Sequence, residues 1–152
     1  MTQITIFSND AHRADVVRLW HDVFGHATGH NAPGLSIDRK LALADGLFFV
    51  ALNGGRVVGT VMAGYDGHRG WLYSVAVAPR QQKRGVGAAL VVHAENALAA
   101  RGCIKVNLQV LAGNEAVTGF YEALGFAVEP RVSMGKLITA NIPASAMPEA
   151  LE

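Results

Sequence analysis

A short basic loop, Gln82–Ala88, holds the residues best suited to binding an anionic ligand. It reads Gln-Lys-Arg-Gly-Val-Gly-Ala and joins an apolar strand, Tyr73–Ala78, to an apolar helix. The first N–H groups of a helix have no intrahelical partner, and the helix dipole adds partial positive charge there. Gly85 and Gly87 let the backbone approach an anion closely because they lack a Cβ atom. The loop is therefore predicted to bind a diphosphate.

Three kinds of phosphate site use a glycine loop between a strand and a helix. A P-loop requires Lys-Ser or Lys-Thr after its glycines, and neither follows Gly87. The dinucleotide fingerprint requires a third glycine where this chain has Leu90. The remaining pattern is Gln or Arg, two residues, Gly, one residue, and Gly or Ala; Gln82, Gly85 and Gly87 match it. A nucleotide-binding module is therefore disfavoured.

A second motif begins at Asn114 and ends at Phe126. It places Tyr121 seven residues after Asn114, inside the run Phe-Tyr-Glu-Ala-Leu-Gly-Phe. With the glycine loop before it, this motif resembles the GNAT superfamily of N-acetyltransferases, and the resemblance covers roughly residues 3–138. It is similar to small bacterial members of the ribosomal-protein alanine N-acetyltransferase type.

The resemblance implies acetyl-CoA as cofactor, with CoA as product. In the superfamily, a strand that splays from its neighbour binds the pantetheine amides through its backbone, like an added strand. The glycine loop would hold the pyrophosphate, and Asn114 would contact the pantetheine arm. The implied cofactor-binding residues are Val75, Ala76, Val77, Gln82, Lys83, Arg84, Gly85, Val86, Gly87, Ala88, Asn114 and Tyr121.

The resemblance also gives Tyr121 a catalytic role. A phenol with a pKa of about 10 stays protonated at neutral pH, whereas a departing thiolate resembles that of cysteine, with a pKa of about 8.5. Tyr121 could therefore donate a hydrogen bond or a proton to the CoA sulfur as the thiolate departs.

The sequence assigns no general base. In the ribosomal-protein subgroup a glutamate on the fifth strand is the base, and the matching residue here is Gln109, which cannot accept a proton. That departure puts a ribosomal-protein acceptor in doubt. Direct attack by a neutral amine, with proximity supplying most of the acceleration, is one alternative. Substitute bases, acting directly or through water, are Asp66, His68, Tyr73 and Glu115.

The pattern of apolar and turn residues predicts a mixed α/β domain. The resemblance implies the GNAT fold, with a mixed, mostly antiparallel central sheet flanked by helices. Strands are expected at 4–7, 47–52, 56–65, 71–78, 104–110, 126–128 and 132–138. Helices are expected at 11–24, 36–44 with Ser36 as N-cap, 86–100 and 114–124. The acetyltransferase domain would span residues 3–138, and residues 139–152 would form a C-terminal tail.

Composition narrows the remaining choices. The chain has 152 residues, one cysteine and a net charge of +1, which favours one domain without a disulfide and without general attraction to nucleic acid. No apolar run approaches the roughly 20 residues of a membrane span, and no export signal is recognised, so a cytoplasmic location is expected. His26 and His30 lack a third ligand nearby, so no metal is predicted. Their loop, residues 25–33, is expected to border the acceptor site.

The predicted function is transfer of the acetyl group of acetyl-CoA to a primary amine by direct attack in a ternary complex. The amine could belong to a small metabolite, an antibiotic or a protein N-terminus. The alternative is a non-catalytic acyl-CoA-binding sensor, which Gln109 keeps open. The oligomeric state is not determined by the sequence, and a homodimer is one option.

Overall fold

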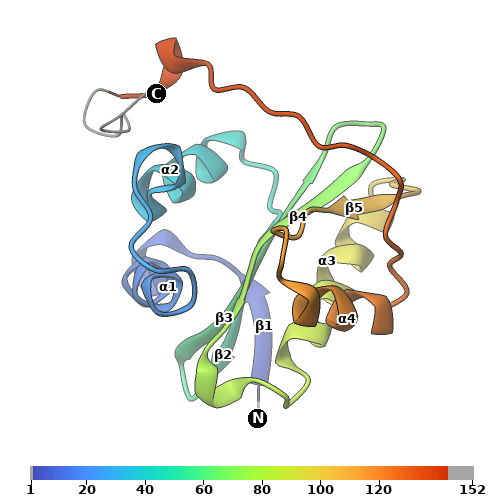
Figure 1. Ribbon diagram of the computed structural model, residues 1–152. Coiled ribbons are helices and arrows are strands. Elements are labelled where there is room, and N and C mark those ends of the chain that lie inside the picture. The colour runs from blue at the N-terminus through green and yellow to red at the C-terminus, as the bar shows by residue number, and fades with distance from the viewer. Residues whose placement is uncertain (1, 144–152) are drawn as a thin grey trace.

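The central sheet of the computed structural model, which describes residues 2–143, has five strands in the order β1-β2-β3-β4-β5 (Figure 1). Strands β1 to β4 form an antiparallel meander, and β5 runs parallel to β4. The bounds are β1 Thr2–Ile6, β2 Phe48–Asn53, β3 Arg56–Tyr65, β4 Gly70–Val77 and β5 Val106–Leu108. The predicted mixed, mostly antiparallel sheet is confirmed.

Helices cover both faces of this sheet (Figure 1). Helices α1, Asn9–Phe24, and α2, Pro33–Leu43, lie on one face; α3, Val86–Ala99, and α4, Glu115–Ala123, lie on the other. Each face has its own buried apolar cluster, one packed under α1 and α2 and one under α3. The middle strand β3 is buried continuously from residue 57 to 63, as expected for a strand with helices on both faces. No helix within residues 2–143 is long and apolar enough to cross a bilayer.

Two helix starts differ from the predicted ones. Helix α2 begins at Pro33 and not after Ser36, because proline needs no N–H partner in the first turn and its fixed φ suits a helix start. Helix α1 begins at Asn9 and not at residue 11, and Ser8 before it makes no side-chain cap. Its own N–H instead donates to Nδ1 of the buried His12 at 2.9 Å.

The two last predicted strands, 126–128 and 132–138, are wrong. The structure has no strand in residues 109–143, and β5 is shorter than the predicted 104–110. Val128, Val132 and Met134 are 76%, 88% and 92% exposed, so this segment buries no face that would fix a pairing register. Pro130, which has no N–H to donate, interrupts it.

Side chains join this segment to β5 in place of a backbone ladder. Glu129 accepts hydrogen bonds from Lys105 at 2.5 Å and from Asn107 at 2.7 Å. The chain then continues across to α2, where a guanidinium nitrogen of Arg39 donates to the Asn141 carbonyl at 2.8 Å (Figure 1). The predicted tail contains a 3-10 turn at Thr139–Asn141, and residues 144–152 lie outside the described residues.

Candidate functional site

Strand β4 contains a bulge at the stretch expected to bind the cofactor. Two residues of β4, Ser74 and Val75, lie opposite one residue of β3, Val61, so the register of the ladder shifts there. Ser74 has a φ of 51°, in the left-handed region. This conformation costs a residue other than glycine about 1–2 kcal/mol. The bulge is therefore a locally strained feature that surrounding contacts must hold in place.

The bulge decides which way the backbone of β4 faces. Before it, the N–H of Gly70 points at β5, where it donates to the Lys105 carbonyl at 2.8 Å. Beyond it, Ala76 pairs with Thr60, and the N–H of Ala78 donates to the Val58 carbonyl of β3 at 2.8 Å. Because backbone groups alternate along an antiparallel strand, those of the residues flanking Ala76 point away from β3.

Val75 and Val77 are the two residues whose backbone N–H and C=O groups face the open edge. An unbroken alternation from Gly70 would have turned them toward β3, so the extra residue at the bulge exposes them. The side chains show the same change of phase, since Leu72 and Val75 both pack on the α3 face although they are three residues apart. Ala76 differs from its neighbours: its backbone faces β3 and its side chain is buried on the α1 face.

Strands β4 and β5 separate next to the bulge. They pair only from Gly70 to Leu72, so the edge of β4 that carries Val75 and Val77 has no strand partner within residues 2–143. Gln82 Nε2 donates to the Val77 carbonyl at 3.1 Å. A strand edge with open backbone groups can pair with an extended, amide-containing ligand.

The glycine loop follows this edge directly and leads into α3. Gly85 occupies the N-cap position of α3 with a φ of 81°, and Lys83 also has a positive φ, of 63°. Space around Gly85 is open, since an added Cβ atom would meet nothing within 4 Å. At Gly87 such an atom would lie 3.2 Å from the Phe120 ring, so this glycine allows close packing against α4.

The chemistry of this donor set suits an anion with an extended amide tail. The first amides of α3, at Val86, Gly87 and Ala88, face away from the helix body, and the side chains of Lys83 and Arg84 are exposed beside them. The open edge of β4 ends at Val77, and a 3-10 turn, Pro79–Gln81, and the glycine loop connect it to Val86. The predicted residues of the strand and of the loop thus belong to consecutive segments of the chain.

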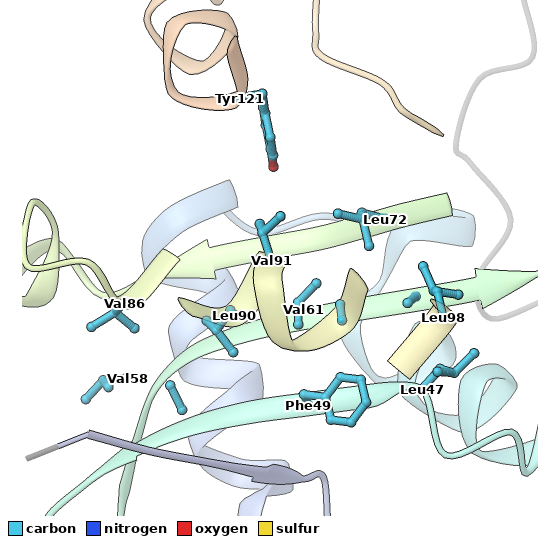
Figure 2. Packing of buried hydrophobic residues seen from close by; sticks show 13 residues of the cluster. Leu47, Phe49, Val58, Val61, Leu72, Val86, Leu90, Val91, Leu98 and Tyr121 are labelled. Atoms are coloured by element: carbon cyan, nitrogen blue, oxygen red, sulfur yellow. The ribbon is translucent and has the colours of Figure 1, made fainter. Parts of the chain in front are cut away.

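Tyr121 projects from α4 into the space next to β4. Figure 2 shows its phenol directed toward the strand that carries Leu72 and toward Val91 of α3. The ring packs edge-on against Phe120, with centroids 4.9 Å apart, and against Phe126, at 5.7 Å. The side chain is buried, and burial raises the pKa of the Tyr121 phenol above its ordinary value. Tyr121 is therefore a protonated donor at neutral pH.

A cavity of about 1060 Å³ lies between β5, α4 and residues 126–133. Asn114, directly before α4, and Tyr121 both line it, whereas no residue of the glycine loop does. Within the cavity wall, burial raises the pKa of Glu95. The structure thus brings Asn114 and Tyr121 together on one wall and places the loop and the β4 edge on a separate surface.

Gln109 and one of the four candidate bases, Asp66, have structural partners. Gln109 Nε2 donates to Ser133 Oγ at 2.6 Å. Asp66 accepts the N–H groups of His68 and Arg69 at 2.7 Å each, and these bonds lower the pKa of the Asp66 carboxyl. The Asp66 carboxylate therefore stabilises the turn between β3 and β4.

Two further candidates, Tyr73 and Glu115, lie in different parts of the structure. Tyr73 is 40% exposed, and its ring centroid is 5.5 Å from the buried ammonium of Lys40. Glu115 is in the first turn of α4 and borders the cavity. Neither contact identifies a base.

The histidine loop forms no recognisable metal centre. The rings of His26 and His21 lie 4.2 Å apart, and His30 is in a separate 3-10 turn, Gly29–Asn31. Within the described part of the chain, residues 2–143, no group of three or more His, Cys, Asp or Glu side chains could hold a metal ion.

One buried polar contact at the bulge was not predicted from the sequence. Trp20 Nε1 donates to Thr60 Oγ1 at 2.9 Å, and Thr60 Oγ1 donates to the Ser74 carbonyl at 2.8 Å. The one hint in the sequence is a hydroxyl inside the apolar run of β3, because a buried hydroxyl needs a partner.

Comparison with known proteins decides the family. Residues 13–126 match the model of the acetyltransferase (GNAT) family. The chain belongs to the GNAT family of acetyltransferases. A protein of Pectobacterium atrosepticum named as an acetyltransferase is 41% identical to this GNAT chain over 124 residues, which cover 82% of the chain and 81% of that protein.

Two solved structures show the same GNAT fold at low identity. A transcriptional regulator from Bacillus halodurans superposes with a TM-score of 0.73 at 22% identity and covers 90% of this chain and 100% of its own. The ribosomal-protein alanine N-acetyltransferase of Escherichia coli has a TM-score of 0.65 at 22% identity, covering 82% and 77%. The predicted family, fold and use of acetyl-CoA are confirmed, and membership of the family supports acetyl transfer in general.

Proposed function

We propose that this GNAT protein is an N-acetyltransferase that transfers the acetyl group of acetyl-CoA to a primary amine by direct attack in a ternary complex. The observation that carries the proposal is the bulged, open edge of β4, which a 3-10 turn and the glycine loop connect to the amide-rich start of α3. When bound, acetyl-CoA supplies an acetyl thioester already activated for transfer to an amine. The residues of this chain bind and orient it.

The open edge and the glycine loop share the binding of the cofactor. The backbone groups of Val75 and Val77 would bind the pantetheine amides, since these are the groups that the bulge turns outward. The backbone amides from Lys83 to Ala88 would bind the pyrophosphate, assisted by the charges of Lys83 and Arg84. Ala76 would hold this edge in place by pairing with Thr60 of β3, and Gln82 would do so by donating to the Val77 carbonyl.

Two residues of the α4 region would act near the thioester. Asn114 would contact the pantetheine arm from the start of α4. Tyr121 holds the proton for the departing sulfur, because its buried phenol has a raised pKa and stays protonated at neutral pH.

The amine is proposed to attack in its neutral form, with proximity supplying most of the acceleration. The C–N bond forms and the C–S bond breaks, the sulfur takes the Tyr121 proton, and the nitrogen loses one proton to water, from which Tyr121 is reprotonated. This route is favoured because Gln109 cannot accept a proton and Asp66 is engaged in a turn. The loop of residues 25–33 is proposed to border the acceptor site. The candidate acceptors are amines of metabolites, of antibiotics and of protein N-termini. A homodimer is the candidate working unit.

A non-catalytic acyl-CoA sensor is the second candidate. It is supported by Gln109, which stands where the ribosomal-protein subgroup has its base and instead bonds Ser133. Such a protein would need the β4 edge and the α3 loop but neither Tyr121 nor an acceptor site.

One experiment separates these candidates. The purified protein is mixed with acetyl-CoA and a panel of primary amines, free thiol is followed with a chromogenic reagent, and CoA binding is measured by calorimetry. Thiol release that depends on the amine supports the transferase. Binding without release for any amine supports the sensor, and absence of CoA binding contradicts both.

A further inference from the structure

We propose that Trp20 and Thr60 are positioning residues for acetyl-CoA, because their hydrogen bonds hold the β4 bulge in the form that exposes the backbone of Val75 and Val77. The inference rests on the proposed role of that edge in binding the cofactor. Neither side chain touches the edge itself. Both act through the Ser74 carbonyl.

The contact is a short chain of two buried hydrogen bonds. The indole N–H of Trp20, on α1, donates to the Thr60 hydroxyl on β3 at 2.9 Å, and that hydroxyl donates to the Ser74 carbonyl on β4 at 2.8 Å. Trp20 is 4% exposed and Thr60 is 0% exposed. Because Thr60 accepts one bond and donates the other, its hydroxyl hydrogen has one defined direction.

Packing alone does not account for a threonine at this position. The cluster around it is apolar and includes Phe48, Val50 and Met62. A valine has nearly the same shape and would fill the space without a hydroxyl, although it would leave the Trp20 N–H without its acceptor. The hydroxyl is thus retained in an apolar setting, and the atom to which it donates belongs to the strained residue of the bulge.

The hydrogen bond from Thr60 can stabilise the strained conformation of Ser74. A serine at a φ of 51° would be less strained in the extended region, and such a rotation would reorient its carbonyl. The Thr60 hydroxyl bonds that carbonyl in the bulged form, and the rotation would carry the carbonyl away from this position. The two hydrogen bonds therefore favour the left-handed conformation over the extended one.

Loss of the bulge would reverse the direction in which the backbone groups of Val75 and Val77 point. With Ser74 extended, the alternation set by Gly70 would continue, and the backbone groups of Val75 and Val77 would turn toward β3. The edge of β4 would then present the wrong residues to an extended ligand. A buried contact on the α1 face thereby controls a binding edge that opens on the β5 side.

The test measures CoA binding in variants that keep or remove the hydroxyl. Thr60→Val removes it at nearly constant shape, Thr60→Ser keeps it, and Trp20→Phe removes the indole N–H while keeping an aromatic ring. Ile37→Val, in the same buried cluster on α2, is the control for a general loss of packing. The CoA dissociation constant is measured by calorimetry, at a temperature where circular dichroism shows every variant folded.

Thr60→Val is expected to raise the CoA dissociation constant about 10-fold, the effect of one net hydrogen bond. Trp20→Phe should raise it less, because the hydroxyl can still bond Ser74. Thr60→Ser should bind like the wild type, and Ile37→Val should lower the melting temperature with unchanged affinity. In turnover assays the Michaelis constant for acetyl-CoA should rise more than kcat falls.

Three outcomes would overturn the inference. Wild-type affinity in Thr60→Val, with only a lowered melting temperature, would show that the hydrogen bonds serve stability alone. Equal losses of affinity in Ile37→Val and Thr60→Val would show that any loosening of this cluster weakens binding. Should Thr60→Val fail to fold, wild-type affinity in Trp20→Phe overturns it. Failure of the wild type to bind CoA contradicts the proposed function itself, which separates the two failures.

Discussion

Gln109 and Ser133 are joined by a hydrogen bond of 2.6 Å from the Gln109 amide nitrogen to the serine hydroxyl oxygen. The contact fastens the residues after β5 to the segment after α4, and both residues line the same cavity. A glutamine thus has a structural partner at the position where relatives in the ribosomal-protein subgroup are expected to have a catalytic glutamate.

Replacing Gln109 by glutamate is expected to leave the CoA dissociation constant unchanged, because the carboxylate can accept a hydrogen bond from the same Ser133 hydroxyl. Turnover with peptide amines should rise at neutral pH if the new carboxylate can accept the proton of the amine. The profile of kcat against pH for wild type and Gln109→Glu checks this. Ser133→Ala, which breaks the contact without adding a base, is the control. Weaker CoA binding in Gln109→Glu would contradict the prediction that Gln109 is not needed to bind the cofactor.

Tyr121→Phe should lower kcat by about 100-fold, within the range that general-acid groups contribute. Binding of CoA should change little, because the aromatic packing on Phe120 and Phe126 is retained. Tyr65→Phe is a matched control, since the Tyr65 hydroxyl makes only long contacts of 3.4 Å at an exposed turn. Wild-type turnover in Tyr121→Phe would show that this tyrosine has a packing role only.

The same phenol predicts a feature of the pH profile. Burial raises the pKa of Tyr121 above its ordinary value of about 10, so the donor form persists through neutral and moderately alkaline pH. The wild-type kcat should therefore show no falling limb from this group below about pH 10. Steady-state rates measured from pH 6 upward with one responsive amine test it. A loss of activity with a midpoint near pH 8 that Tyr121→Phe abolishes would contradict the role.

Gly85→Val should weaken CoA binding severely while the domain stays folded. The position has a φ of 81°, which a β-branched residue adopts only with strain, and it starts the helix proposed to bind the pyrophosphate. Gly55 is an unusually close control, because it has the same φ of 81° and the same open surroundings but lies in the turn between β2 and β3. Calorimetry on both variants checks the claim, and equal affinity loss in Gly55→Val would refute it.

Local patterns predicted most of the fold. The hairpin between β2 and β3 follows from two apolar runs around Asn53-Gly54, and α3 follows from an apolar run ended by Gly102, whose φ is 88°. The prediction of the last two strands was wrong because an alternating pattern shows that a segment can be extended but not that it has a strand to pair with. Only the exposure of residues such as Val132 reveals that no sheet forms there.

The candidate site also has a part that the sequence predicted and a part that it did not. The glycine loop was recognisable because its ligand-binding groups are consecutive in the chain. The bulge was not, because one extra residue in an apolar strand leaves no mark on composition, and Ser74 is not the glycine usual at a positive φ. The support of the bulge joins Trp20 to Thr60 across 40 residues, a separation that only the folded structure brings together.

Asp15→Asn is expected to destabilise the protein in a pH-dependent way. Asp15 accepts the Val57 N–H at 3.1 Å and pairs with Arg18 at 3.0 Å and Arg56 at 3.2 Å, which ties α1 to the start of β3. Burial alone would raise the pKa of the Asp15 carboxyl, but these bonds and charges outweigh it and lower the pKa below the ordinary value of 3.8. The folded state therefore favours the ionised form.

The sign of the pH dependence follows from that shift. The stabilisation is complete above the unfolded-state pKa and is lost as the pH falls through the lower folded-state value. At pH 7 the variant should melt about 2–4 °C below wild type, as for a loss near 1 kcal/mol in a domain of this size. Thermal denaturation from pH 7 down to pH 2 should show the difference shrinking below about pH 4. Asp22→Asn, an exposed change on the same helix, should show no such difference, and a gap between wild type and Asp15→Asn that persisted at pH 2 would mean that the charge of Asp15 is not its cause.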